Sequence, residues 1–430
     1  MLNRLDLRGV PADELPAHLP RPELAGEEPV AAVREILADV AARGDDALIE
    51  LTERFDGARL ARLDVPPEER AAALERIPAE LRTALEVAAD RVREFHLTQV
   101  RADHRVERDG VVVEALVRPV DRAGLYVPGG RASYPSTVLH TAIPAKVAGV
   151  GQLVLCVPPD RATGRVADVT LAAAAIAGVD ELYAVGGAQA IGAMAYGTAT
   201  IGRVDVIAGP GNVYVALAKR LVADRVGIAA AFAGPSEVVV VADASIDPEL
   251  AAIDVILQAE HGPDGLAWLV TWDEAVADAV TEAVERLVGA APRHHEIAAT
   301  LDAAGHAALV DSPEMAMAVS NLIAPEHLEL LVDDPRALLP LVRHAGAVFC
   351  GPWSPASFGD YLAGPSHVLP TDGTARFSSA LTVADFTKDI HVVTVSPDGF
   401  DALGPHVVTL AAAEGLDAHA ESVRLRQARR

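Results

Sequence analysis

The feature that most constrains the fold is an alternation of short apolar segments with alanine-rich segments from about residue 120 to residue 240. This alternation predicts strands at Leu153–Val157, Leu182–Val185, Val204–Ile207 and Val238–Val241, with helices near 165–177, 188–196 and 213–223. Strands separated by helices are joined by right-handed crossovers, which make the sheet parallel and place helices on its two faces.

The alternation resumes between residues 247 and about 376. We therefore predict an α/β protein with two doubly wound, Rossmann-like sheet domains and small N-terminal and C-terminal arms. The expected divisions are an N-terminal arm of residues 1–26, an α/β domain of 27–119 with 240–380, a second α/β domain of 120–239, and a C-terminal arm of 381–430.

The chain is strongly acidic, which restricts its partners. It carries 61 Asp and Glu residues against 36 Lys and Arg, a formal net charge of -25 at pH 7. Such a surface disfavours nucleic acid and anionic membranes, and no apolar run reaches the ~18 residues that suggest a membrane span. Cys156 and Cys350 lie inside apolar runs and indicate buried structural thiols, with no disulfide framework or cysteine zinc cluster. We expect a cytoplasmic protein without nucleic-acid or membrane partners.

Three glycine-bearing turns follow expected strand ends: Tyr126–Gly130, Gly186–Gln189 and Gly209–Asn212. Glycine there lets the backbone approach a phosphate or a ribose, and ligands prefer the carboxyl ends of such strands. The dinucleotide fingerprint is missing, because the nearest string, Gly149–Gly151, precedes a strand instead of following one. Each turn taken alone is better explained by ordinary turn chemistry.

Glu326 and His327 are adjacent titratable groups directly after Pro325. Proline biases the preceding residue toward an extended conformation, so the pair is expected at a turn or at the start of a strand. In an extended segment neighbouring side chains point to opposite sides, and only a bent backbone lets both face one cavity. A carboxylate and an imidazole in one water-excluding site could share proton removal and delivery. The alternative is a solvated surface dipeptide.

Gln258 and His261 are three residues apart and share a face if they lie on a helix, which Gly262 and Pro263 would end. An amide and an imidazole on one face can ligate a metal, or they can simply form the polar end of a helix.

A loop rich in Gly, Pro and Ser contains Asp360 and His367, and Glu414 and His419 lie near the C-terminus. Long structured loops are commonly functional. Glu414 and His419 are five residues apart and share no helical face unless Gly415 breaks the helix. Together, Gln258, His261, Asp360 and His419 offer an oxygen and nitrogen ligand set that suits zinc or manganese, although spacing alone does not assemble it.

Several strings of the sequence resemble the histidinol dehydrogenase family, in the family's order and over nearly the whole chain. They are Tyr126–Gly130, Ile143–Gly149, Gly234–Glu237, Gln258–Asp264, Ala324–Glu329, Ser354–Tyr361, His367–Thr371 and Glu414–His419. Two departures are modest: Gly265-Leu266-Ala267 is less polar than expected, and Ser366 stands where the family usually has Asn.

The resemblance implies oxidation of L-histidinol to L-histidine through histidinaldehyde with two NAD reduced, the last step of histidine biosynthesis. It also implies one zinc per site that is not redox-active and anchors the substrate's imidazole and amine. The implied zinc ligands are Gln258, His261, Asp360 and His419.

The same resemblance implies the roles of the remaining site residues. Glu326 would be the base that activates water, and His327 the proton relay of the alcohol step. The implied NAD contacts are Tyr126, Gln189 and Asn212, and the implied substrate contacts are Ser236, Gln258, His261, His327, Asp360, His367, Glu414 and His419. The family is a homodimer whose C-terminal arm crosses to the partner, so His419 would complete the other subunit's site.

Two other functions stay open at this point. A zinc hydrolase could use Glu326 to activate a metal-bound water, and it would produce no NADH from histidinol. A metal- or imidazole-binding protein with an inactive site would bind histidinol without turnover.

Overall fold

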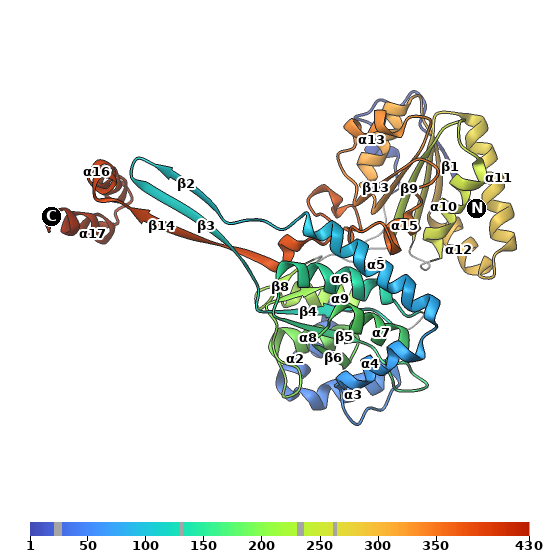
Figure 1. Ribbon diagram of the computed structural model, residues 1–430. Coiled ribbons are helices and arrows are strands. Elements are labelled where there is room, and N and C mark those ends of the chain that lie inside the picture. Colours follow the sequence, from blue (N-terminus) through green and yellow to red (C-terminus); the bar gives the residue numbers. More distant parts are fainter. Residues whose placement is uncertain (21–27, 130–131, 230–235, 261–264, 430) are drawn as a thin grey trace. The chain divides into compact units, whose positions relative to one another are not determined.

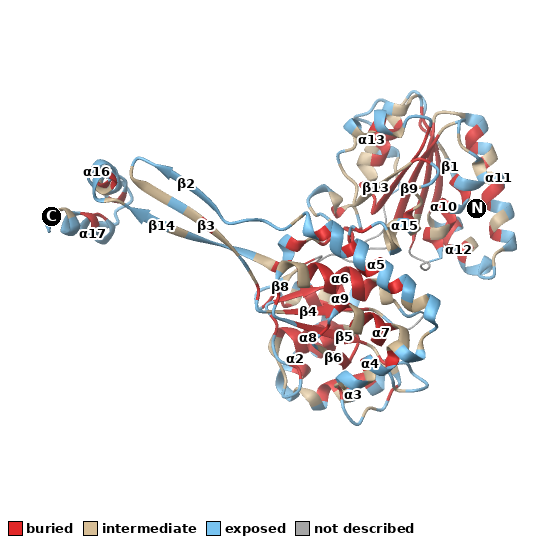
Figure 2. Ribbon diagram, viewed as in Figure 1, coloured by how far each residue is buried: buried red, intermediate tan, exposed pale blue. Residues whose placement is uncertain are grey.

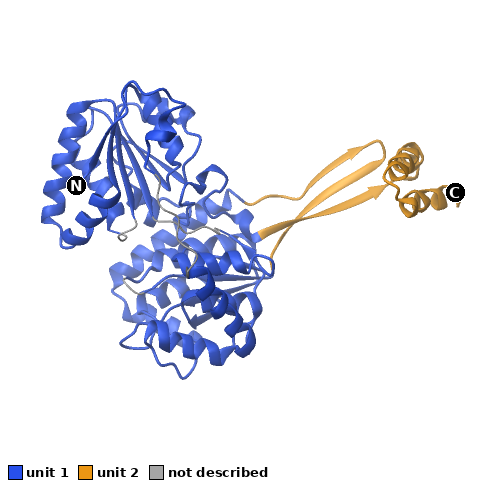
Figure 3. Ribbon diagram, turned by 180° about the vertical axis from the view of Figure 1, so that it is seen from behind, with its two compact units in different colours: residues 1–99, 121–386 blue, residues 100–120, 387–430 orange. Residues whose placement is uncertain are grey.

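The computed structural model describes residues 1–20, 28–129, 132–229, 236–260 and 265–429. The chain forms two compact units, Met1–Gln99 with Asp121–Phe386 and Val100–Val120 with Thr387–Arg430 (Figure 3). The first unit contains two separate parallel sheets, and the second contains an antiparallel one.

The first sheet of unit 1 has six parallel strands in the order β1-β11-β10-β9-β12-β13 (Figure 1). Their bounds are Asn3–Asp6 (β1), Gly305–Leu309 (β11), Leu266–Thr271 (β10), Glu237–Ala242 (β9), His327–Leu331 (β12) and Ala347–Cys350 (β13). Because side chains alternate along a strand, Val238 and Val240 of β9 belong to one core cluster, whereas Val239 and Val241 belong to another. The first cluster includes helices α10 (Pro248–Ala259), α11 (Glu274–Ala290) and α12 (His294–Ala304), and the second includes α13 (Pro313–Ile323).

The second sheet of unit 1 has five parallel strands in the order β6-β5-β4-β7-β8. Their bounds are Glu181–Ala184 (β6), Gln152–Val157 (β5), Arg122–Tyr126 (β4), Val206–Ala208 (β7) and Gly227–Ile228 (β8). Its helices are α2 (Glu28–Arg43), α3 (Asp45–Asp56), α4 (Pro67–Arg76), α5 (Ala79–Leu97), α6 (Pro135–Ala148), α7 (Asp168–Ala177), α8 (Gly187–Tyr196) and α9 (Val213–Leu221). The prediction of an α/β fold with two doubly wound sheets is confirmed.

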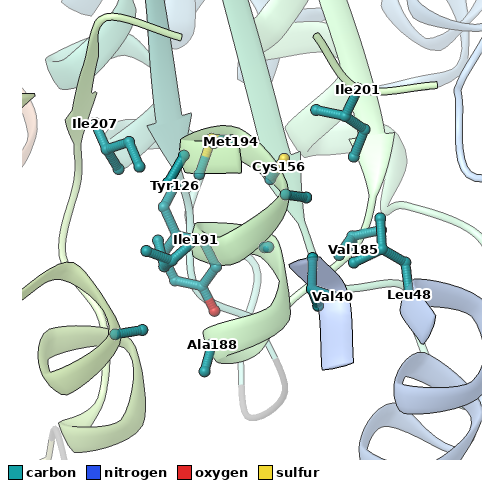
Figure 4. Packing of buried hydrophobic residues seen from close by; sticks show 14 of the residues in the cluster. Val40, Leu48, Tyr126, Cys156, Val185, Ala188, Ile191, Met194, Ile201 and Ile207 are labelled. Carbon is teal, nitrogen blue, oxygen red and sulfur yellow. The ribbon is translucent and has the colours of Figure 1, made fainter. Parts of the chain in front are cut away.

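The structure groups several segments differently from the expected divisions. Helices α2 and α3 pack on the five-stranded sheet, and Figure 4 shows Val40 and Leu48 from these helices together with Ile191 and Met194 of α8. Close packing is possible because Gly192 of α8 has no side chain where a Cβ would stand 3.0 Å from Leu37. Within the expected N-terminal arm, residues 3–6 form β1 and pair with β11.

The expected boundary at residues 239 and 240 passes through β9, which pairs with β10 and β12 of the six-stranded sheet. The apolar run Val238–Val241 was therefore predicted correctly as a strand but was grouped with the wrong alternation. Its four valines are completely buried and fit the centre of either sheet, so the sequence pattern did not distinguish the two.

Unit 2 is a three-stranded antiparallel sheet followed by two helices. The strands, in the order β14-β3-β2, are Thr387–Val395 (β14), Val111–Pro119 (β3) and His104–Arg108 (β2), and the helices are α16 (Pro397–Ala413) and α17 (Asp417–Gln427). Figure 2 shows strands that are mostly exposed or intermediate in burial, in contrast to the buried strands of unit 1.

Short elements complete the described chain. They are helices α1 (Leu15–His18), α14 (Pro335–Leu338) and α15 (Ala356–Tyr361), and 3-10 helices at Leu339–Leu341, Thr374–Arg376 and Val383–Phe386. Within the described ranges, no helix is both long and apolar enough to cross a membrane.

Candidate active site

A cavity of about 400 Å³ in unit 1 gathers residues that the sequence predicted separately. Ser236 and Glu326 stand immediately before β9 and β12, His327 opens β12, and Gln258 lies at the end of α10. The predicted residues among its lining are Asn212, Ser236, Gln258, Glu326, His327, Asp360 and His367.

The turn before β12 explains how adjacent residues can face one cavity. Helix α13 ends at Ile323, and Ala324 adopts a left-handed conformation with φ 54°. This conformation is uncommon for a residue with a Cβ, and it bends the chain just before Pro325. Glu326 is therefore still in the turn when His327 begins the strand, and both side chains line the cavity, as predicted for a bent backbone.

Glu326 is almost fully buried, with 8% of its surface exposed. Its Oε2 accepts a hydrogen bond from the backbone N–H of Glu237 at 3.1 Å. Burial raises the pKa of Glu326 to about 7, against the opposing effect of the neighbouring His327. A carboxyl that titrates near neutral pH can take up and release protons under physiological conditions.

His327 lies between two carboxylates. Its Nδ1 is 3.7 Å from Glu326 Oε2, and its Nε2 is 3.5 Å from Asp360 Oδ1. Burial alone would lower the pKa of this imidazole, but the charges of Glu326 and Asp360 outweigh it and raise the pKa to about 8. The pair therefore offers an acid and a base whose pKa values lie near each other, which suits proton relay.

Gln258 and Asp360 have two properties expected of metal ligands, an oxygen donor in the side chain and a place in the cavity lining. Gln258 is buried, lines the cavity, and its Oε1 accepts no hydrogen bond from the described residues. A buried amide oxygen without a donor is unusual, and it is available to bind a ligand such as a metal ion. Asp360 lines the same cavity from α15, with 24% of its side chain exposed.

The described residues contain no cluster of three or more His, Cys, Asp or Glu side chains that could hold a metal ion. The predicted ligand set would not form such a cluster among the described residues of unit 1. Gln258 carries an amide and does not count toward such a cluster. His261 lies outside the described residues, and His419 belongs to unit 2. Asp360 is therefore the one member of the predicted set in unit 1 that is both described and a His, Cys, Asp or Glu residue. Donor chemistry and the unpartnered oxygen of Gln258 fit a zinc ion bound here.

His367 is held by three polar contacts. Its Nδ1 is 2.9 Å from the carbonyl oxygen of Asp360, its Nε2 is 3.1 Å from the hydroxyl of Thr137, and its backbone N–H donates to Nδ1 of His140 at 3.2 Å. The rings of His367 and His140 are stacked with centroids 4.4 Å apart. Ser366, where the family usually has Asn, donates its hydroxyl hydrogen to the backbone oxygen of His140 at 2.9 Å.

Sequence reasoning missed His140 and Glu237. His140 is buried inside α6, and its burial keeps its pKa well below the ordinary value of 6.5, so the ring is neutral. Its place in an otherwise apolar helix gave no signal. Glu237 follows Ser236 directly, and its backbone contacts both Glu326 and His327: its N–H donates to Glu326, and its carbonyl oxygen lies 3.3 Å from His327 Nδ1.

A second missed feature is a pair of buried carboxyl groups behind the cavity, Asp254 and Glu329. Asp254 is one helical turn before Gln258 on α10, and Glu329 is two residues after His327 on β12. Glu329 Oε1 accepts the N–H of Ala356, the first residue of α15. Burial raises the pKa of both carboxyls, and their mutual contact raises that of Glu329 further, so the pair retains a proton. The sequence signal was a carboxylate within an apolar run, Leu328-Glu329-Leu330.

A neighbouring cavity of about 740 Å³ collects the three predicted NAD contacts, Tyr126, Gln189 and Asn212. They stand at the carboxyl ends of β4, β6 and β7, where ligands bind in parallel sheets. The Tyr126 hydroxyl accepts the N–H of Gly187 at 3.0 Å, and the Asn212 side chain caps α9. Asn212 lines both this cavity and the one that contains Glu326 and His327.

Glu414 and His419 belong to unit 2. Glu414 follows the end of α16, and Gly415 adopts a left-handed conformation with φ 71° before α17 begins at Asp417. The helix is therefore broken between Glu414 and His419. The sequence required such a break if these two side chains, five residues apart, were to face the same site. Their predicted roles in the site stay predictions.

Comparison with known proteins shows that the chain is similar to the members of one enzyme family. A family model described as histidinol dehydrogenase matches residues 19–427. The chain is 50% identical over 398 residues to the histidinol dehydrogenase of Pseudomonas aeruginosa, which covers 92% of this chain and 90% of that one. It is also 50% identical over 400 residues to that of a Synechococcus strain, with 92% of each chain covered. The crystal structure of histidinol dehydrogenase from Elizabethkingia anophelis is similar with a TM-score of 0.93 at 37% identity, covering 99% of this chain and 98% of that one.

Proposed function

Because the chain belongs to the histidinol dehydrogenase family, NAD-dependent oxidoreductases that catalyse the last step of histidine biosynthesis, we propose that it oxidises L-histidinol to L-histidine through histidinaldehyde with two NAD reduced. The observation that carries the proposal is the convergence of Gln258, Glu326, His327 and Asp360 on one cavity that adjoins, at Asn212, a second cavity with the predicted NAD contacts.

In the first oxidation His327 takes the hydroxyl proton of histidinol while a hydride leaves the carbinol carbon. In the second, Glu326 takes a proton from the water whose oxygen bonds to the aldehyde carbon. Loss of another hydride then leaves the carboxylic acid of histidine, which releases a second proton to become the carboxylate. A bound NAD would supply the hydride acceptor that each oxidation needs. The pKa values of about 7 for Glu326 and about 8 for His327 support proton transfer in both directions near neutral pH.

We further propose that Gln258, His261 and Asp360, with His419 from the C-terminal arm of a second copy, hold one zinc ion. Zinc supplies a fixed anchor for the substrate's imidazole and amine. The unpartnered Oε1 of Gln258 supports this ligand set.

Ser236, His367 and Glu414 are proposed as further substrate contacts, in a homodimer whose sites are shared. The first two line the catalytic cavity. Mixing inactive His419 and Glu326 variants should then restore part of the activity, because one hybrid site keeps both residues. No recovery after verified subunit exchange would count against shared sites. The acidic composition supports a cytoplasmic location.

The test is to measure bound zinc and the NADH formed per histidinol in one preparation. Two NADH per histidinol with stoichiometric zinc is expected. Hydrolysis without NADH would favour a zinc hydrolase, and calorimetric binding of histidinol without turnover would favour an inactive binding protein.

A further inference from the structure

The wall of the cofactor cavity opposite the strand ends is built by α2 and α3. It contains three acidic residues, Glu35 and Asp39 on α2 and Asp56 at the end of α3, together with Arg54 and Phe55. Asp39 is paired with Arg43, and Arg54 lies over the ring of Phe55 at 5.1 Å. Asp56 differs from the other two acidic residues because one of its oxygens is buried.

The position of Asp56 is unfavourable for a negatively charged side chain. It is the last residue of α3, where the helix dipole disfavours a negative charge. Its Oδ2 is buried and accepts no hydrogen bond from the described part of the chain. Burial raises the pKa of Asp56 to about 6, although the nearby Arg161 opposes this effect. A buried acceptor without a donor is costly, which suggests that the donor comes from a ligand of the cavity.

The two cavities indicate which part of a dinucleotide would meet this wall. The nicotinamide ring must reach the substrate beside Glu326 and His327, and Asn212 lines both cavities. Asp56 lines the cofactor cavity and not the catalytic one. The adenosine half of the dinucleotide therefore faces α2 and α3.

We propose, on the basis of the proposed NAD-dependent function, that Asp56 is a cofactor-binding residue whose carboxylate accepts hydrogen bonds from the hydroxyl groups of the adenosine ribose. A carboxylate in this position favours a free 2′-hydroxyl and repels the 2′-phosphate of NADP. Asp56 thus selects NAD over NADP without the usual glycine-rich fingerprint, and Glu35 on the same wall adds to the repulsion.

The test is calorimetric titration of the full-length protein with NAD and with NADP, for the wild type, Asp56→Asn and Glu53→Gln. Glu53 is the matched control, because it lies on the same helix and pairs with Arg59 but does not line the cavity. Asp56→Asn is expected to bind NAD about tenfold more weakly, the effect of losing one charge-assisted hydrogen bond, and to lose at least tenfold of its preference over NADP. Glu53→Gln should match the wild type with both dinucleotides.

Asp56→Asn should retain the wild-type melting temperature or exceed it, because it removes a charge that burial and the helix dipole disfavour. If it does not fold, Asp56→Ser serves the same comparison. Wild-type affinities of a folded Asp56 variant for both dinucleotides would overturn the proposal. A wild type that binds no NAD would instead overturn the proposed function.

Discussion

Replacing Glu326 by Gln should make the protein less active and more stable. The carboxyl has an ordinary pKa of 4.5 and a pKa of about 7 in the folded protein, a rise that corresponds to about 3 kcal/mol of destabilisation when the group is ionised. The amide is neutral and can still accept the N–H of Glu237. It also removes the negative charge that raises the pKa of His327, which offsets part of the gain. We expect a net increase of about 2 kcal/mol in the free energy of unfolding at pH 8.

The sign of the pH dependence follows from proton binding. Between pH 4.5 and about 7 the folded wild type holds a proton on Glu326 that the unfolded chain has released, so this residue makes the wild type less stable as the pH rises. The variant lacks that titration. The difference in stability should therefore be absent below pH 4.5 and grow up to about pH 7. It should grow further until about pH 8, where His327 loses the proton whose attraction to Glu326 offsets part of the gain.

Urea unfolding of the metal-free protein at pH 4.5 and pH 8 measures the stability, and NADH absorbance with histidinol measures the activity. Activity should fall by about 10²–10⁴, the usual contribution of a general base. Glu282→Gln, an exposed carboxylate on α11, is the control and should change neither quantity. Unchanged or reduced stability at pH 8, in a variant with wild-type circular dichroism, would refute the argument that burial holds this carboxyl near neutrality. Retained activity would remove Glu326 from the chemistry.

Three further predictions concern the metal, the cofactor turn and the buried carboxyl pair. Gln258→Ala should lose zinc on dialysis, as measured by atomic absorption, and full retention would remove Gln258 from the ligand set. Gly209→Ala should lower the melting temperature and weaken NAD binding, because Gly209 has φ +112° and a Cβ there would lie 2.0 Å from a carbonyl oxygen. Gly289→Ala, where a Cβ meets nothing within 4 Å, is the control and should be neutral or stabilising, so equal effects would contradict the steric argument. Glu329→Leu should cost about 1–3 kcal/mol of stability because the N–H of Ala356 loses its acceptor, whereas Glu329→Gln keeps one and should stay near wild type in denaturant titrations. Equal losses in both would exclude that hydrogen bond as the cause.

The gathering of Tyr126, Gln189 and Asn212 at one cavity could be predicted from the sequence because its signals are local. A strand, a glycine turn and a helix follow one another within about ten residues around Gln189 and Asn212, and parallel strands bring their carboxyl ends to one edge. The bend at Ala324 and Pro325 is local in the same sense.

The remaining features depend on contacts between segments far apart in the chain. The apolar stripe of α2 does not indicate which sheet it covers, and the valines of β9 fit either sheet. The contact of Asp254 with Glu329 joins a helix to a strand, and neither residue predicts the other. The same holds for His140 under His367, since a histidine in an apolar helix resembles any buried polar residue.

The position of Asn212 at the meeting of two cavities bears on how a two-step oxidation can run to completion. The proposed reaction would exchange one reduced dinucleotide for an oxidised one in each turnover while the aldehyde intermediate stays bound. Because the two cavities are distinct and share the lining residue Asn212, the dinucleotide can be exchanged from one while the half-oxidised substrate stays bound in the other.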